Sequence, residues 1–379
     1  MTISIYVHIP FCIRKCPYCD FYSIEKKSDE IPYKEYLSNI LRQFDDQTIT
    51  QHPSPISIYF GGGTPSLMPA SFFGNLIDAC ARRSNLCAPE ITCEVNPGTV
   101  EMNWFKDILS AGVNRVSIGV QSFDDQMLQK LGRIHTSEEA QVAIASAQDA
   151  GFKNVSIDLM NGLPDQRVDD LIDDLRQAMT FQPQHISVYQ LTPPKGSLYH
   201  LPPEDKLVEM LKVTKRILER GGWHHYEISN FAKKDFESKH NMNYWNYGEY
   251  LGLGVGASSF FLNSPPCQGG GGGGEGDYFA TRTTTKPNLQ NYLNGIFEYD
   301  TDDITKRQAM GEFCFLGMRK IEGADLKRFE RLFETKFTDV FTEVIQRLRE
   351  DGLIELTPTH LKLTEKGLLF SNQVFAEFV

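Results

Sequence analysis

Two kinds of segment alternate along the N-terminal half of the chain, and this alternation constrains the fold more than any other feature. The short runs rich in β-branched residues are Ile3–Ile9, Ile56–Phe60, Ile91–Val95, Arg115–Val120, Val155–Leu159 and Ile186–Leu191. The stretches with helical spacing between them include Tyr33–Asp45, Ser71–Arg82, Glu138–Ala150 and Asp169–Met179. Alternation of this kind predicts right-handed crossovers and a parallel sheet. Six units are too few for a closed eightfold barrel, so the α/β region 1–220 is predicted to be an open, partial (β/α)6 barrel.

Polar or glycine-rich residues stand where each of these strands is predicted to end. They are a cysteine-rich loop after the first strand and then Gly61–Pro65, Glu94–Pro97, Gly119–Phe123, Asp158 and Gln190–Pro193. In barrels built from parallel strands, the chemistry lies at the C-terminal ends of the strands. The sequence therefore predicts one functional rim.

The loop after the first strand carries Cys12, Cys16 and Cys19 at C-x3-C-x2-C spacing. Three thiolates on one loop suit an iron–sulfur cluster in which the fourth iron has no protein ligand. Structural zinc requires four ligands, and His8 is a candidate for the fourth. Because His8 belongs to a predicted strand and the spacing is tighter than paired zinc motifs, the sequence favours the cluster.

Other residues at the predicted rim carry groups that bind small polar ligands. The run Gly61–Gly63 allows a ligand to approach the main chain closely, although a tight turn needs the same residues. Glu94 and Asp158 are carboxylates suited to ribose hydroxyls or an ammonium group, or to capping a loop. Gln121 and Arg133 are donors suited to a carboxylate or a ribose.

Composition narrows the class of protein. The chain has 379 residues, a net charge of −11 and a pI near 5.4, which argues against nucleic acid as the main partner. It contains no apolar run long enough for a membrane span and no signal-peptide pattern. Its eight cysteines do not form the framework of a small secreted domain. We therefore expect a cytoplasmic protein.

Taken together, the rim residues resemble the coproporphyrinogen dehydrogenase branch of the radical S-adenosylmethionine (SAM) superfamily. The resemblance extends to intervals, such as twelve residues from Gln121 to Arg133 and twenty-five more to Asp158. It implies that Cys12, Cys16 and Cys19 hold a 4Fe–4S cluster. It also implies a SAM site formed by Tyr6, Tyr18, Gly62, Gly63, Thr64, Glu94, Gln121, Arg133, Asp158 and Thr192.

Two features favour the non-decarboxylating members of this branch, the HemW-type heme chaperones. Phe21 stands where the decarboxylating oxidases carry a further cysteine, and the chain begins on the first strand without their long extension. The segment His240–Trp245 also matches the H-N-x-x-Y-W signature of these chaperones. The resemblance implies that His240 ligates heme iron, for which imidazole is a normal axial ligand. The residues alone, without the family signature, favour a histidine in a surface loop with aromatic packing neighbours.

The implied partners are heme, heme-accepting apo-proteins such as respiratory enzymes, and a protein that reduces the cluster. One alternative stays open at this point. An oxygen-independent coproporphyrinogen III oxidase would use the same cluster and SAM to make a 5′-deoxyadenosyl radical and decarboxylate a propionate. The sequence does not decide whether the chain is an enzyme, and we assign no catalytic residue.

The rest of the chain no longer shows the alternation of strands and helices. Residues 221–300 are predicted to be a connecting segment that holds the histidine signature and a flexible glycine-rich loop, Pro265–Gly276, beside an exposed Cys267. Residues 301–379 are predicted to be an α+β, winged-helix-like domain. Its strands are Leu353–Thr357 and Leu361–Thr364, and its helix carries the apolar stripe Val340, Phe341, Val344, Ile345 and Leu348. Because the chain is acidic, we expect this domain to be a packing module rather than a DNA reader. Cys80, Cys87 and Cys93 are predicted to be packing cysteines.

Overall fold

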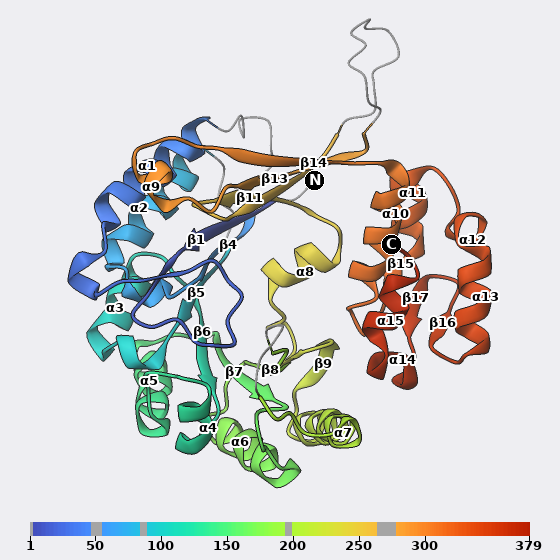
Figure 1. The fold of residues 1–379 in the computed structure, drawn as a ribbon, viewed down its shortest axis with the longest axis horizontal. Coiled ribbons are helices and arrows are strands. Elements are labelled where there is room, and N and C mark those ends of the chain that lie inside the picture. Colours follow the sequence, from blue (N-terminus) through green and yellow to red (C-terminus); the bar gives the residue numbers. More distant parts are fainter. Residues whose placement is uncertain (1–2, 47–54, 84–88, 194–198, 264–277) are drawn as a thin grey trace, which may run out of the picture.

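The computed structural model describes residues 3–46, 55–83, 89–193, 199–263 and 278–379. A curved sheet of parallel strands forms the centre of the molecule (Figure 1). Its six central strands, in spatial order, are β1 (Ile3–Ile9), β4 (Pro55–Gly62), β5 (Glu90–Val95), β6 (Arg115–Gln121), β7 (Val155–Asn161) and β8 (His185–Gln190). Strand order therefore follows chain order, and the predicted open (β/α)6 barrel is confirmed.

Amphipathic helices cover the convex face of this sheet (Figure 1). The covering helices are α1 (Tyr33–Asp46), α2 (Ala70–Arg83), α3 (Met102–Ser110), α4 (Asp125–Lys130), α5 (Ser137–Ala150), α6 (Val168–Thr180) and α7 (Glu204–Arg220). Local signals fix their ends: a capping box between Thr136 and Glu139 starts α5, and Gly151 ends it with φ +109°. Along the strands beneath, apolar residues alternate with polar ones, and many of the polar residues, such as Ser57, Thr92 and Ser187, are buried as well.

The sheet continues beyond the six predicted strands at both edges. Next to β1 lies β11 (Glu249–Leu253) in parallel, followed by antiparallel strands β12 (Ser258–Leu262), β13 (Ala280–Thr285) and β14 (Tyr299–Ile304). Next to β8 lie β10 (Asn230–Ala232) and β9 (His224–Glu227). Segment 221–300 therefore contributes strands to the same sheet as the barrel. A short helix, α9 (Leu289–Leu293), packs against α1.

Helix α8 (Lys239–Trp245) lies on the concave side of the sheet, opposite all the covering helices (Figure 1). Its N-terminus is fixed by the buried carboxylate of Glu90, which accepts hydrogen bonds from the backbone N–H of Lys239 at 3.2 Å and of His240 at 3.3 Å. A carboxylate at a helix N-terminus is favoured by the free N–H groups and the helix dipole. The barrel interior therefore contains a helix that the sequence pattern did not predict.

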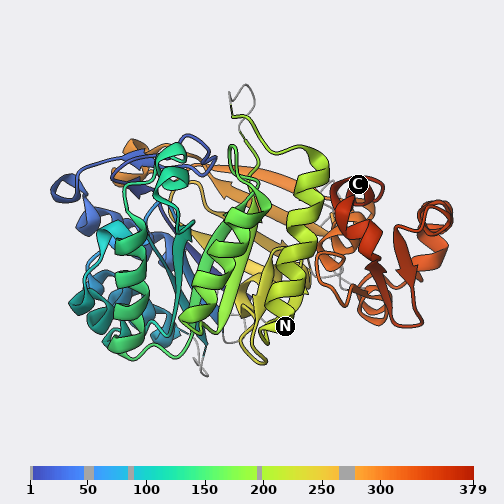
Figure 2. The same cartoon turned by 90° about the horizontal axis from the view of Figure 1, so that it is seen from below.

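The C-terminal region packs at one end of the sheet, beside α7 (Figure 2). Its helices are α10 (Lys306–Gly317), α11 (Leu326–Phe333), α12 (Phe337–Val340), α13 (Thr342–Glu350), α14 (Glu365–Leu369) and α15 (Ser371–Ala376). The predicted strand pair is confirmed as β16 (Ile354–Leu356) and β17 (His360–Leu363), which β15 (Ala324–Asp325) joins. Its core also includes Tyr247 and Phe260 from the sheet region, so this domain is packed onto the barrel.

The structure tests two of the four cysteine predictions. Cys80 on α2 and Cys93 on β5 are buried, as packing cysteines should be. Cys87, Cys267 and the glycine-rich loop lie outside the described residues.

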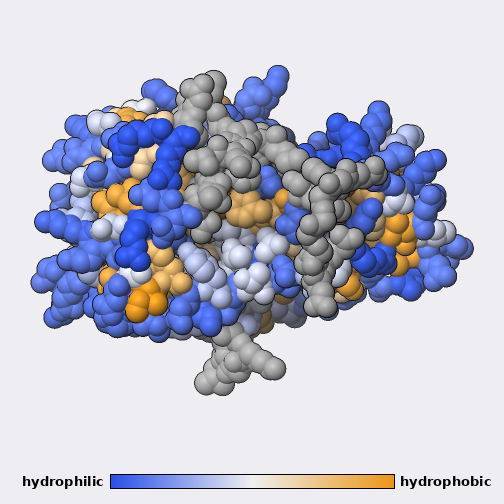
Figure 3. All heavy atoms as spheres, turned by 90° about the horizontal axis from the view of Figure 1, so that it is seen from above, coloured by the Kyte–Doolittle hydropathy of each residue, from blue (hydrophilic) through white to orange (hydrophobic). Residues whose placement is uncertain are grey.

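The face seen in Figure 3 is mostly hydrophilic, with hydrophobic side chains in small separate groups. Among the helices that the structure describes, none has both the length and the apolar character needed to cross a bilayer.

Candidate functional site

The cysteine loop is shaped by its own backbone and by a short strand pair. Strands β2 (Phe11–Cys12) and β3 (Ile24–Glu25) pair in parallel and bring the two ends of the loop together. Within the loop, the N–H of Cys19 donates to the carbonyl of Cys16 at 3.0 Å. Cys12 is 8% exposed, whereas Cys16 and Cys19 are half-buried. The thiols therefore lie on a loop that is closed at its base and open toward the rim.

Hydrogen-bond donors surround these thiols. The Thr64 hydroxyl donates to Cys12 Sγ at 3.4 Å, and Arg133 Nη1 approaches Cys16 Sγ at 3.8 Å. Burial raises the pKa of Cys19, and the nearby thiols of Cys12 and Cys16 raise it further. Cys12 and Cys16 are therefore close enough to Cys19 for their charges to affect its thiol. Donors from Thr64 and Arg133 would stabilise negative charge there.

A single zinc ion does not fit this arrangement well. Both ring nitrogens of His8 are engaged, Nδ1 with the Tyr6 hydroxyl at 3.0 Å and Nε2 with the Tyr22 carbonyl at 2.8 Å. Across the described parts of the chain, no group of three His, Cys, Asp or Glu side chains gathers closely enough to bind one ion. An iron–sulfur cluster is larger and takes its thiolates further apart, so the donor set suits a cluster.

The glycine run lies against this loop and is tightly packed. Gly62 has φ +114°, and a Cβ at this position would lie 2.5 Å from the His8 ring. A Cβ at Gly63 would lie 3.1 Å from Cys12 Sγ. Side chains at these positions would therefore overlap the loop or its neighbours, which explains why both residues are glycine.

Glu94 lies near the C-terminal end of β5, beside the glycine run. Its Oε1 accepts from the Tyr59 hydroxyl at 2.9 Å, and its Oε2 accepts from the Gly62 N–H at 3.2 Å. Burial raises the pKa of Glu94 to about 7; the Tyr59 hydrogen bond opposes this rise and the charge of Asp158 adds to it. The carboxyl therefore changes charge close to neutral pH.

Gln121 and Arg133 meet over the end of β6. Gln121 has φ +68°, a left-handed conformation that costs free energy for a residue other than glycine. A Cβ added at Gly119 would lie 2.8 Å from Gln121 Nε2 and 3.5 Å from Arg133 Nη2. Arg133 Nη2 donates to the Gly119 carbonyl at 2.9 Å, while its buried Nε has no partner in the described residues. Gln121 and Arg133, which were predicted to donate to a carboxylate or a ribose, therefore lie in one site. Arg133 Nε offers an N–H there that no described group accepts.

The other predicted rim residues differ in position. Tyr18 lies beside Arg133 and Cys16. Burial raises the pKa of the Tyr18 hydroxyl, Arg133 lowers it, and Cys16 raises it further. Asp158 is not at a strand end, because β7 continues to Asn161. Its carboxylate accepts from the hydroxyls of Ser117 at 2.7 Å, Ser156 at 3.0 Å and Ser187 at 2.7 Å. Thr192 is exposed and lines a separate cavity of about 900 Å³ beside α7.

The reading of His240 as a surface-loop histidine is wrong. His240 lies on α8, is 2% exposed, and stacks on the Tyr59 ring at 4.8 Å. Its Nδ1 bonds to the Ser57 hydroxyl at 2.9 Å and its Nε2 to the Tyr244 hydroxyl at 3.0 Å. Burial lowers the pKa of His240 to about 3, and the Arg115 charge lowers it further. The imidazole is therefore neutral. To coordinate a metal ion, His240 would have to give up one of these two hydrogen bonds.

A second hollow lies where the cysteine loop, α8, the sheet extension and α10 meet. This aromatic cavity has a volume of about 520 Å³. The residues that line it are Tyr6, His8, Asp20, Phe21, Tyr22, Tyr244, Trp245, Tyr247, Gly248, Tyr250, Gly256, Ala257, Ser258, Phe260, Arg282, Phe315 and Leu316. Phe21 is 64% exposed at its mouth, and Arg319 stacks behind Trp245 at 4.4 Å. An apolar cavity with a few polar groups is typical of a site for a small organic ligand.

Sequence reasoning missed several residues of the barrel interior. The serines that hold Asp158 occupy neighbouring strands in the motifs Val-Ser-Ile (β6 and β7) and Ile-Ser-Val (β8). The period of two along each strand was a usable signal for them, because it places small polar residues on one face. No comparable signal marked Arg282 or Phe315, since the cavity joins segments far apart in the chain.

Comparisons with known proteins agree with this geometry. A profile of the radical SAM superfamily matches residues 6–178, and a profile of the HemN C-terminal domain matches residues 304–370. The chain is 37% identical to the heme chaperone HemW of Haemophilus influenzae and 36% identical to that of Escherichia coli, covering 100% of this chain and 98% of each relative. It is 31% identical to the mitochondrial radical S-adenosyl methionine domain-containing protein 1 of Danio rerio, covering 98% of this chain and 85% of that protein.

A solved structure shows the same fold. Coproporphyrinogen III oxidase (HemN) from Escherichia coli, a radical SAM enzyme, superposes with a TM-score of 0.80 at 20% identity, covering 100% of this chain and 90% of that one. At this level of identity the likeness concerns the fold alone. It covers both the barrel and the C-terminal domain.

Proposed function

Because the chain belongs to the HemW family of radical SAM proteins, we propose that it is a heme chaperone, which binds heme and transfers it to acceptor proteins. The HemW relatives match it over nearly their whole length. The proposal therefore concerns the whole chain and not one domain.

The observation that carries the proposal is the aromatic cavity. Both aromatic residues of the family signature, Tyr244 and Trp245, line it, and so does Phe21, the residue that replaces the further cysteine of the oxidases. A flat macrocycle with apolar faces gains both buried area and ring stacking in such a site. The half-open mouth beside Phe21 suits a cargo that must leave again.

The polar rim supports a resident cluster and SAM. Cys12, Cys16 and Cys19 would hold the 4Fe–4S cluster, which supplies one-electron chemistry when bound. Thr64 and Arg133 would donate hydrogen bonds to its thiolates.

The same rim has groups for each part of SAM. Gln121 and the unpartnered Arg133 Nε suit the carboxylate. Glu94 and Asp158 suit hydroxyl or ammonium donors, and Gly62 and Gly63 bring main chain close to the cysteine loop. Tyr6 and Tyr18 would contribute their rings to the walls of this site, and Thr192 is proposed only from the family pattern.

The partners follow from this role. We propose that heme-accepting apo-proteins, such as respiratory enzymes, receive the cargo and that a separate protein reduces the cluster. We place the chain in the cytoplasm, where thiols stay reduced. The low charge of the cavity and the acidic chain give no support to nucleic acid as a partner.

Heme titration of the full-length protein, followed by its absorption spectrum, tests the proposal. We expect saturable binding of one heme per chain, and absence of binding would refute it. His240→Ala and His8→Ala separate the two candidate imidazoles, since only His8 lines the cavity. Unchanged heme affinity and spectrum in His240→Ala would remove His240 as a ligand.

The oxidase alternative is not favoured. The full-length relatives at 36–37% identity are named heme chaperones, whereas the oxidase structure shares only 20% identity and supports the fold alone. Anaerobic incubation with coproporphyrinogen III, SAM and a reductant tests this directly. Release of carbon dioxide would restore the oxidase as the function.

A further inference from the structure

The aromatic cavity has very little charge, and one side chain provides its only permanent cation. Among the described residues that line it, Arg282 is the only arginine or lysine and Asp20 is the only carboxylate. A cavity with apolar walls and a single guanidinium fits an amphipathic ligand that carries a carboxylate. Heme has this chemistry, because its apolar ring bears propionate groups.

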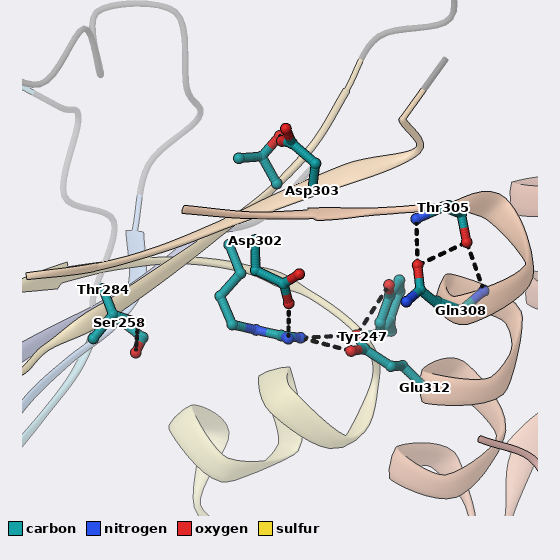
Figure 4. A network of polar contacts seen from close by, with 10 residues as sticks. Tyr247, Ser258, Thr284, Asp302, Asp303, Thr305, Gln308 and Glu312 are labelled. Atoms are coloured by element: carbon teal, nitrogen blue, oxygen red, sulfur yellow. Dashed lines mark hydrogen bonds and ion pairs between the residues drawn. The ribbon is translucent and has the colours of Figure 1, made fainter. Parts of the chain in front are cut away.

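The guanidinium of Arg282 is already held in an ion-pair network between two parts of the fold. Arg282 lies on β13, and its Nη2 donates to both carboxylate oxygens of Glu312 on α10, at 2.9 and 2.8 Å. Its Nη1 lies 3.5 Å from Asp302 on β14, and the Tyr247 hydroxyl donates to Glu312 at 3.4 Å. Figure 4 shows Glu312 and Asp302 converging on one guanidinium from different elements.

This network joins the sheet to the C-terminal domain. Glu312 is the better-buried acid, with a side chain 16% exposed, whereas Asp302 is 66% exposed. A third carboxylate beside Arg282 would repel both acids, so it must take the place of one of them. Glu312 does not itself line the cavity, but it lies on α10, and Phe315 and Leu316 of the same helix do line it.

We propose that Arg282 selects carboxylate-bearing ligands in the aromatic cavity, and that the ligand carboxylate displaces Glu312 from the guanidinium. The inference rests on the proposed heme-binding function and adds a specificity residue and a coupling to it. Exchange of one carboxylate for another keeps the guanidinium paired throughout. Loss of the Glu312 contact loosens α10 from β13, so the cargo alters the contact between the two domains.

The test compares heme with its dimethyl ester, which keeps the ring and iron but has no free carboxylate. Full-length wild type, Arg282→Gln and Glu312→Gln are titrated with each. We expect wild type to prefer heme by about tenfold or more, as for a charge-assisted pair. Arg282→Gln loses that preference and keeps its affinity for the ester. Glu312→Gln binds heme more tightly, because the ligand no longer competes with a carboxylate.

Lys286→Gln is the matched control. Lys286 lies just after β13 and pairs with Asp300 at 3.6 Å, but it does not line the cavity. This variant should keep the wild-type preference, and loss of preference in it would mean that general charge, not Arg282, selects the ligand. If Arg282→Gln does not fold, Glu312→Gln carries the test, and unchanged or weaker heme binding in it overturns the proposal.

Hydrogen exchange of α10 measures whether the ligand displaces Glu312 from Arg282. Heme binding should speed exchange in Lys306–Gly317, and the ester should leave it unchanged. Equal protection with both ligands overturns the displacement of Glu312. Wild type that binds neither ligand refutes the proposed function itself, whereas equal binding of both refutes only the role of Arg282.

Discussion

The polar rim and the aromatic cavity share the cysteine loop, yet they are built in opposite ways. Most rim groups stand at or near the ends of consecutive parallel strands, and Glu94 and Arg133 are held by hydrogen bonds to the Tyr59 hydroxyl and to nearby main-chain groups. Apart from Tyr6 and His8 on β1 and the cysteine loop, the cavity takes its walls from α8, β11 to β13 and α10, which the chain reaches only after residue 238. The difference separates a site fixed by the barrel from one that depends on how a second domain docks.

The largest expected effect is loss of the cluster from the rim alone. Cys12→Ser, Cys16→Ser or Cys19→Ser should abolish the iron and sulfide content and the broad visible absorption after anaerobic reconstitution, because three thiolates are the minimum set. Heme affinity should be retained, since none of the three lines the cavity. Cys80→Ala on α2 is the control and should keep its cluster. A cysteine-loop variant with full iron and sulfide would break the assignment.

The next effect concerns the close packing of the rim. Gly62→Ala should lower the free energy of unfolding by about 3 kcal/mol, because it combines a left-handed backbone with overlap of the His8 ring. Urea unfolding measures it. Gly222→Ala is the matched control, because Gly222 also has positive φ but an added Cβ there would meet no other described residue within 4 Å. It should cost only about 1 kcal/mol. Equal costs would show that the contact with His8 is unimportant.

A smaller effect is expected at the cavity. Trp245→Ala should weaken heme binding about tenfold, or about 1.4 kcal/mol, through loss of ring stacking and buried area. Its cluster content should not change, in contrast to the cysteine variants. Tyr299→Ala removes an exposed aromatic side chain from β14 that does not line the cavity, and should bind heme normally. Full heme affinity in Trp245→Ala would place the heme elsewhere.

The last prediction concerns the pH dependence of stability. The folded pKa of His240 is about 3, below its unfolded value near 6.5, so the unfolded state binds more protons between these values. Its contribution to stability is therefore fully present above pH 6.5 and is lost as pH falls, by at most about 1.4 kcal/mol per pH unit. Urea unfolding of the cluster-free protein from pH 7 to about pH 4.5 should show that His240→Gln loses less stability than wild type as pH falls. Parallel curves would mean that His240 is not buried neutral.

Much of the barrel could be predicted from the sequence, because covered parallel strands and amphipathic helices have strong local patterns. The strand Ile3–Ile9 was predicted to the residue, and α1 ends one residue beyond its prediction. The cysteine loop, Glu94 and Gln121 lie at or just after strand ends, as predicted, whereas Arg133 follows α4 and reaches the end of β6 only through the fold. The prediction failed at Asp158, whose strand continues, and for the surface-loop reading of His240, which lies on an interior helix.

The chain sequence by itself determined the barrel, the cysteine loop and the family signature, because each depends on residues close together or on a repeating pattern. Only the tertiary structure decided that the sheet extends through β9 to β14, that His240 is buried, and that Arg282 and Trp245 share a cavity. Those outcomes depend on contacts between segments far apart in the chain, and no local periodicity records which of these segments will meet.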